Sequence, residues 1–225
     1  MFAECFENVR STCPLIHNIT NYVTVNDCAN MVLACGASPI MADDAAEVED
    51  ITTICGGLNI NIGTLNSRTI TSMLLAGKKA NLLGHPVVLD PVGAGASQLR
   101  TDTANRLLRE VKFTVIRGNI SEVKTLASGA GTTKGVDADV ADKVTEENLD
   151  SAVAFAKAFA ARTGADDVAE IVGGVSLGKL FRGKGLARLR GIDVEADRAL
   201  VERLDDVAAV RIENIVEIPI VNHFA

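Results

Sequence analysis

Residues 85–97 read HPVVLDPVGAGAS, and the expected class of structure follows from this stretch. The apolar run up to Leu89 is typical of a buried β-strand, and the glycine-rich segment after it is typical of a tight turn. Asp90 stands where the strand ends. Glycine-rich turns bring backbone N–H groups close to phosphates, whereas a carboxylate at the end of a strand more often faces a cation. The stretch therefore suggests a bound nucleotide and its metal.

The same alternation of strand and helix patterns extends over the sequence on both sides, up to about residue 160. Such alternation indicates βα units, so we expect an α/β fold with a mainly parallel central sheet flanked by helices. The predicted strands are 37–41, 57–62, 85–90 and 113–118, and the predicted helices are about 26–35, 67–83, 101–110, with Thr101 as N-cap, and 146–163. Ligands bind beyond the carboxyl ends of the strands in such sheets. One edge should therefore gather the residues at or just past these ends, which are Met41, Gly63, Asp90 and Arg117.

The amino-acid composition limits the classes of protein and of binding partner that fit this sequence. The 225 residues, of which 48% are hydrophobic and 23% charged, are enough for one globular domain or one domain with an appendage. A formal net charge of −7 argues against a general affinity for polyanions, so nucleic acid is not an expected partner. The five cysteines are odd in number and show no CxxC spacing, which predicts neither disulfides nor a zinc site and fits the reducing cytoplasm. The N-terminal residues do not resemble a signal peptide, and no apolar run is long enough to suggest a membrane span.

Five motifs carry a resemblance to a known family. They are PLIHNITNYVTVNDCAN (14–30), GASPIMADDAAEVED (36–50), NIGTLN (61–66), LDPVGAGAS (89–97) and VIRGNISEV (115–123). In order and spacing they resemble the successive motifs of hydroxyethylthiazole kinase, a ribokinase-like enzyme of thiamine salvage. The resemblance implies transfer of the ATP γ-phosphate to the hydroxyethyl group of 4-methyl-5-(2-hydroxyethyl)thiazole, with Mg²⁺ as counter-ion. It also implies a homotrimer with active sites between the subunits.

The resemblance assigns Asp90 and Glu122 to the metal, and hard oxygen ligands of this kind suit Mg²⁺, often through its waters. Without the family, Asp90 could cap the turn that follows it, and Glu122 could cap a helix or form an ion pair. Arg117 resembles the family's ATP-contacting arginine, whose fork matches phosphate oxygens. A surface ion pair is the alternative for Arg117.

The resemblance also places residues around the substrate. Asn21 belongs to a segment that reaches towards nucleotide and substrate, although a loop amide that binds its own backbone is the alternative. Met41 resembles the residue that lines the thiazole pocket, where a thioether can lie against a flat heterocycle, but it could also be ordinary core. Gly63 fits a position where the backbone must approach the substrate. His17 is expected to pack or cap rather than to catalyse.

The resemblance stops near Gly164. The family continues there with a strand ending in an ATP-contacting threonine and then with a Gly-Thr-Gly-Cys turn, which forms the anion hole and carries the catalytic cysteine. Neither motif is recognisable after Gly164, and all five cysteines precede residue 56. We therefore divide the chain into a kinase core (1–164) and a divergent C-terminal segment (165–225), and no catalytic residue is assigned.

A partial substitute for the missing turn is GGVSLGKL (173–180), which fits the pattern GxxxxGK. Leu180 stands where a phosphate-binding loop needs a hydroxyl, so an anion site made by Gly173, Gly174 and Lys179 is an alternative to a solvated loop. Two functions remain open. The chain is an active thiazole kinase, or it is a catalytically impaired relative that still binds nucleotide or thiazole. Because the loss of anion-hole donors costs roughly 10²–10³ in rate, we expect feeble turnover.

Overall fold

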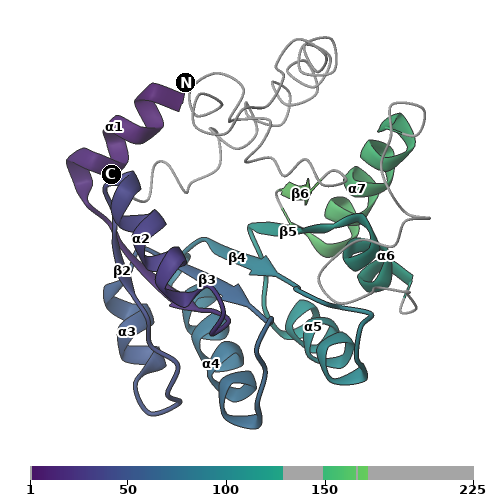
Figure 1. Ribbon diagram of the computed structural model, residues 1–225, viewed down its shortest axis with the longest axis horizontal. Helices are drawn as coiled ribbons and strands as arrows, with labels where there is room; N and C mark the ends of the chain where they lie inside the picture. The colour runs from purple at the N-terminus through teal and green to yellow at the C-terminus, as the bar shows by residue number, and fades with distance from the viewer. Residues whose placement is uncertain (1, 129–148, 166, 172–225) are drawn as a thin grey trace.

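The computed structural model describes residues 2–128, 149–165 and 167–171. In chain order the elements are α1 (Phe2–Thr12), β1 (Leu15–Ile19), α2 (Val25–Cys35), β2 (Ser38–Ile40), α3 (Val48–Ile54), β3 (Gly57–Asn61), α4 (Ser67–Leu83), β4 (Val87–Asp90), α5 (Gln98–Glu110), β5 (Val115–Asn119), α6 (Ile120–Ser128), α7 (Leu149–Thr163) and β6 (Asp167–Ile171). The strands form a six-stranded sheet in the order β2-β1-β3-β4-β5-β6, and every pairing in it is parallel (Figure 1). The predicted α/β class with a parallel sheet and flanking helices is confirmed.

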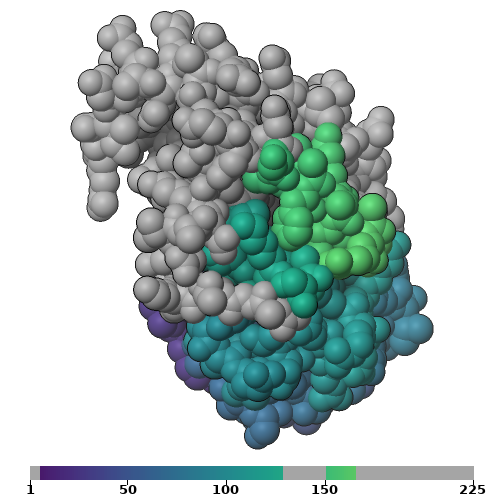
Figure 2. Space-filling model, turned by 90° about the vertical axis from the view of Figure 1, so that its right-hand side faces the viewer, coloured from purple at the N-terminus to yellow at the C-terminus, as the bar shows by residue number. Residues whose placement is uncertain are grey.

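The predicted elements correspond to four strands (β2, β3, β4 and β5) and four helices (α2, α4, α5 and α7). Helices α3, α4 and α5 lie side by side along the sheet (Figure 1). Figure 2 shows α7 and β6, coloured green, packed against the teal part of the chain, in agreement with the backbone pairing of β6 with β5. None of the described helices is long and apolar enough to cross a membrane.

Register aligns a row of buried aliphatic side chains across the middle of the sheet. Ile19 pairs with Ile60, Ile60 pairs with Leu89, and Leu89 pairs with Ile116. Each of these side chains is at most 1% exposed. Because successive side chains of a strand point to opposite faces, the residue after each member of this row lies on the other face of the sheet, one step closer to the carboxyl edge.

The start of α5 differs from the prediction. Ser97, and not Thr101, is the N-cap: its backbone is extended, and its Oγ accepts a hydrogen bond from the Arg100 N–H at 3.3 Å. Thr101 lies inside the first turn, where its hydroxyl donates to the Ser97 carbonyl and accepts from the Gly95 N–H at 2.9 Å. The prediction of Thr101 as N-cap is wrong because Ser97 closes the glycine-rich turn one helical turn earlier.

The C-terminal part is only partly described. β6 lies just beyond residue 164 and continues the sheet. Residues 172–225, which include the 173–180 motif and Lys179, lie outside the described residues. The division into 1–164 and 165–225 stays a prediction.

Candidate active site

Three of the predicted site residues follow or end a strand. Met41 comes directly after β2, Gly63 comes two residues after β3, and Asp90 is the last residue of β4. Arg117 is a correction, because it is the middle residue of β5 and not its end. The strand continues because Gly118 and Asn119 still pair with β6.

Asp90 and Arg117 are nevertheless brought together by register. Leu89 pairs with Ile116, so the next residues of the two strands, Asp90 and Arg117, are neighbours. Arg117 donates from Nη1 to Asp90 Oδ2 at 2.7 Å, and Asn61, paired with Asp90 on the other side, donates from Nδ2 to the same oxygen at 2.9 Å. Burial raises the pKa of Asp90, while the charge and hydrogen bond of Arg117 and the hydrogen bond of Asn61 act to lower it.

Glu122 is buried in the first turn of α6 and uses both carboxylate oxygens within the protein. Its Oε1 accepts from the Gly93 N–H at 2.7 Å, and its Oε2 accepts from the Asn119 N–H at 2.8 Å. The Glu122 N–H in turn donates to Asn119 Oδ1 at 2.9 Å, which completes the reciprocal pattern of a capping box. The capping role that the sequence left open is therefore present, and it also holds the turn after β4.

The charge of Arg117 acts on both buried carboxylates, Asp90 and Glu122. The pKa of Glu122 is raised to about 7, mainly by burial and also by the nearby charge of Asp90, against the lowering effects of the Gly93 and Asn119 N–H groups and of the Arg117 charge. One guanidinium thus faces two buried acids. No cluster of three or more His, Cys, Asp or Glu side chains that could hold a metal occurs within the described ranges. The donor set fits Mg²⁺, which is commonly bound by one or two carboxylates and completes its shell with waters and phosphate oxygens.

Asn21 is held by its own loop. Its Oδ1 accepts from the N–H groups of Val23 and Thr24 at 3.0 and 3.1 Å, and its Nδ2 donates to Asn61 Oδ1 at 3.2 Å. The alternative that the sequence left open, an amide that binds its own backbone, is therefore seen directly. One N–H of the side-chain amide is engaged by Asn61.

Gly63 is fixed through both of its peptide groups. Its N–H donates to Asn61 Oδ1 at 2.8 Å, and its carbonyl oxygen accepts from Arg100 Nη2 at 2.7 Å. A Cβ at this position would lie 2.9 Å from Asn21 Cβ and from Asn61 Oδ1, so glycine is required by close packing. Arg100 also donates from Nη1 to the Val92 carbonyl at 3.2 Å and so joins the turns after β3 and β4.

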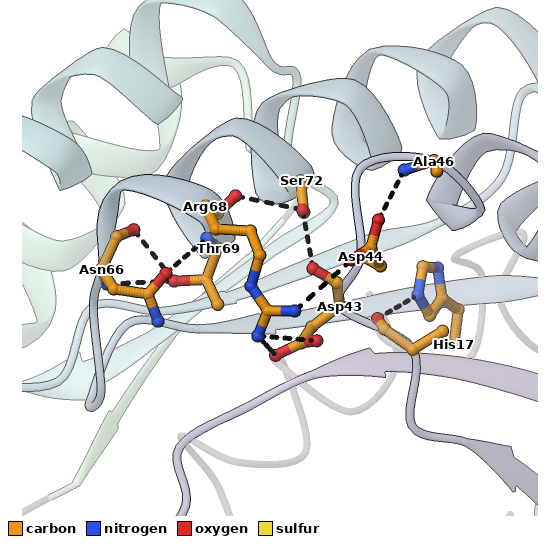
Figure 3. A network of polar contacts seen from close by, with 9 residues as sticks. His17, Asp43, Asp44, Ala46, Asn66, Arg68, Thr69 and Ser72 are labelled. Atoms are coloured by element: carbon orange, nitrogen blue, oxygen red, sulfur yellow. Dashed lines mark hydrogen bonds and ion pairs between the residues drawn. The ribbon is translucent and has the colours of Figure 1, made fainter.

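Met41, which is 37% exposed, begins the loop between β2 and α3, and buried side chains contact the backbone of this loop. The buried His17 contacts the Ala42 carbonyl through Nε2 at 2.9 Å, and the Ser72 hydroxyl donates to the Asp43 carbonyl at 2.7 Å (Figure 3). His17 is therefore a packed, hydrogen-bonded residue, in agreement with the expectation from sequence.

On its exposed side, this loop forms ion pairs with the start of α4. Arg68 forms exposed ion pairs with Asp43 and Asp44 at 3.4 Å, and Asn66 and Thr69 form a capping box at the start of the same helix (Figure 3). Exposed pairs of this kind contribute little to stability, so their main effect is to orient the loop.

Sequence reasoning missed Asn61 and Arg100. Asn61 carried a signal, because polar Asn59 and Asn61 alternate with apolar residues in a strand that is otherwise buried on both faces. Arg100 carried none, since an arginine in an amphipathic helix is ordinary.

Comparison with known proteins shows that this chain matches a known family. The model of the hydroxyethylthiazole kinase family matches residues 6–189. The chain belongs to this family. Hydroxyethylthiazole kinase of Clostridium acetobutylicum is 69% identical over 177 residues, which cover 79% of this chain and 64% of the relative. Hydroxyethylthiazole kinase of Desulfovibrio desulfuricans is 60% identical over 165 residues, which cover 73% and 58%.

A solved structure of the hydroxyethylthiazole kinase protein from Pyrococcus horikoshii OT3 is similar with a TM-score of 0.62 and 36% sequence identity, over 72% of this chain and 57% of that one. The chain spans about three fifths of the length of the hydroxyethylthiazole kinases that it matches, with 64% and 58% of the two relatives covered.

Proposed function

We propose that this chain phosphorylates 4-methyl-5-(2-hydroxyethyl)thiazole with ATP, a reaction of thiamine salvage. Membership of the hydroxyethylthiazole kinase family supports the proposal. The structural observation that carries it is the row Asn61, Asp90 and Arg117, which brings an amide, a carboxylate and a guanidinium together on three neighbouring strands. Phosphoryl transfer needs mainly such positioning and charge neutralisation.

The proposed roles follow from charge and position. Asp90 and Glu122 would hold Mg²⁺, directly or through its waters, and Arg117 would lie against phosphate oxygens of ATP. When bound, Mg²⁺ neutralises charge that develops on the transferring phosphoryl group. Asp90 and Glu122 are buried acids whose pKa values are raised, and a bound cation would favour their charged forms.

The acceptor side of the site, where the thiazole alcohol that receives the phosphoryl group would bind, is proposed to lie over the turns that precede α3 and α4. Met41 would contact the thiazole ring, and the fixed Gly63 backbone would allow its close approach. Asn21, anchored by its loop and by Asn61, would contact ATP. Nothing in the described residues favours the catalytically impaired alternative, but no cysteine follows Cys55, so we expect the phosphorylation rate to be low.

Binding and turnover should be measured separately. We expect the full chain to bind the thiazole alcohol and Mg·ATP by calorimetry and to form the phosphate ester slowly. Asp90→Asn should weaken Mg²⁺-dependent ATP binding about 10- to 100-fold, because a charge-assisted contact is lost, and should leave binding of the alcohol nearly intact. Asp102→Asn, which changes an exposed carboxylate on α5, is the control and should change neither. Equal loss of both ligands in Asp90→Asn would contradict the metal role.

Met41→Asp tests the acceptor side. A charge placed against the thiazole ring should abolish thermal protection by the alcohol and leave Mg·ATP binding unchanged. Absence of protection in the unmutated chain at millimolar alcohol would contradict the proposed substrate.

We also propose that the chain forms a homotrimer with sites shared between subunits and acts in the cytoplasm, where its co-substrate ATP is supplied. Exposed apolar side chains on α2 support self-association. The proposed partners are therefore ATP, the thiazole alcohol and further copies of the chain.

A further inference from the structure

Asn61 occupies the centre of a hydrogen-bonded chain that crosses the carboxyl edge of the sheet. Its Oδ1 accepts from Asn21 Nδ2 at 3.2 Å and from the Gly63 N–H at 2.8 Å, and its Nδ2 donates to Asp90 Oδ2 at 2.9 Å. The chain continues from Asp90 to Arg117 at 2.7 Å. Each of its neighbours is a residue to which we have proposed a substrate, nucleotide or metal role.

The orientation of the Asn61 amide follows from its partners. The backbone N–H of Gly63 can only donate, so the atom facing it is the amide oxygen, and the NH₂ group must then face Asp90. The same argument applies to Asn21, whose oxygen faces the N–H groups of Val23 and Thr24. All donors and acceptors in the chain therefore match, as a stable buried network requires.

Asparagine is well suited to this position. The side chain is only 7% exposed, so its polar atoms depend on protein partners. An aspartate would keep the acceptor for Gly63 but could not donate to Asp90. An alanine would remove both functions. A longer glutamine would have to displace Gly63, whose backbone nitrogen already lies 2.8 Å from Asn61 Oδ1.

Asn59 is a natural comparison. It lies on the same strand two residues earlier, is half-buried, and donates from Nδ2 to Asn18 Oδ1 at 3.3 Å. Its side-chain hydrogen bond goes to Asn18 and not to Gly63 or Asp90, so Asn59 reports the general effect of removing an amide from β3.

We propose that Asn61 is a positioning residue that sets the Gly63 peptide on the acceptor side and the Asp90 carboxylate on the metal side in one fixed geometry. The inference rests on the proposed function for the roles of Gly63 and Asp90, but the positioning itself needs no ligand. Its action is indirect, since Asn61 reaches the ligands only through these neighbours.

The first test is ligand-free amide hydrogen exchange on the full chain. In Asn61→Ala the Gly63 amide should exchange about five- to tenfold faster, because its acceptor is lost. In Asn61→Asp, which retains an acceptor oxygen, protection of Gly63 should be restored. Asn59→Ala should leave Gly63 unchanged. Equal exchange at Gly63 in the unmutated chain and Asn61→Ala, or equal acceleration in Asn59→Ala, would overturn the proposal.

The second test separates the two sides by calorimetry. Asn61→Ala should weaken both the thiazole alcohol and Mg·ATP by about tenfold, whereas Asn61→Asp should weaken only Mg·ATP, because it lacks the N–H that orients Asp90. A merely structural residue would not produce this split. Loss of both ligands in Asn61→Asp, with Gly63 still protected, would overturn the assignment. If the unmutated chain bound neither ligand, the proposed function would fail, and the exchange at Gly63 would still decide the positioning role.

Discussion

At the scale of single residues, His17 shows how a buried polar group is accommodated in the sheet. Its Nε2 faces the Ala42 carbonyl, so this nitrogen must carry a proton. Its Nδ1 lies 2.9 Å from Thr52 Oγ1, while the same hydroxyl lies 2.7 Å from the Val48 carbonyl. Thr52 has one hydroxyl proton, so it donates to His17 when the ring is neutral and to Val48 when the ring is charged. The Thr52 hydroxyl therefore turns with the charge of His17.

This arrangement predicts a pH dependence of stability. Burial lowers the pKa of His17, although the Ala42 carbonyl and the charge of Glu47 act to raise it. Between this lowered pKa and the ordinary value of about 6.5, the unfolded chain binds more protons than the folded chain, so stability falls as pH is lowered through this window. In His17→Gln the free energy of unfolding, measured by urea denaturation, should fall less steeply as the pH is lowered below about 6.5. An unchanged slope would contradict the assignment.

Site residues could be predicted from sequence only where a family motif names them. Asp90 and Glu122 stand in such motifs, but their hydrogen-bond partners depend on register and on the start of α6. The role of Asn61 depends on which strands are neighbours, and no pattern within β3 carries that information. Asn21 and Arg117 remain predicted ligand contacts, although the structure adds the partners that orient them.

At the scale of elements, the sequence did not predict β1, α3 and α6 for physical reasons. In β1 (LIHNI), the polar residues His17 and Asn18 interrupt the apolar pattern that is typical of a buried strand. Thr52 provides the hydrogen-bond partner for the buried His17 ring. α3 is only 7 residues long, which is too short for a helical period to be distinct. α6 follows β5 without a loop, so the two patterns run together.

The turn between β4 and α5 gives a prediction at this scale. Gly93 and Gly84 both have left-handed backbones, with φ of 73° and 71°. A Cβ at Gly93 would collide with the Arg100 guanidinium, whereas a Cβ at Gly84 meets nothing within 4 Å. Gly84→Ala should therefore cost about 1–2 kcal/mol from backbone strain alone, and Gly93→Ala about 1–3 kcal/mol more. Urea denaturation measures both, and equal losses would show that Arg100 yields freely.

Gly93→Ala should also affect ligand binding, since the Gly93 N–H donates to Glu122 and Arg100 holds Gly63. We expect weaker Mg·ATP binding in this variant and unchanged binding in Gly84→Ala, measured by calorimetry.

At the scale of the whole molecule, α2 stands out because it contributes no residue to the core formed by the described residues. The structure describes all of its residues, and none of them is buried. Met31 and Leu33 are 67% and 56% exposed. Since exposed apolar side chains mark interaction sites, we expect α2 to contact another copy of the chain, in line with the proposed trimer.

The double variant Met31→Lys, Leu33→Lys should therefore reduce self-association in sedimentation velocity experiments, because charge is placed in an apolar contact. Leu82→Lys changes a side chain that is 83% exposed on α4 and should leave the assembly intact. A monomeric unmutated chain, or equal dissociation of the two variants, would contradict the role of α2.

The strand order β2-β1-β3-β4-β5-β6 also bears on how the molecule is made. From β4 onward, each strand lies beside the strand that precedes it in the chain. A chain that emerges from the ribosome with its N-terminus first can therefore add each new strand and helix to an edge that already exists, without opening the sheet. Asn61, Asp90 and Arg117 lie on consecutive additions, so this row would be completed during synthesis when β5 joins β4, and Glu122 would follow on α6.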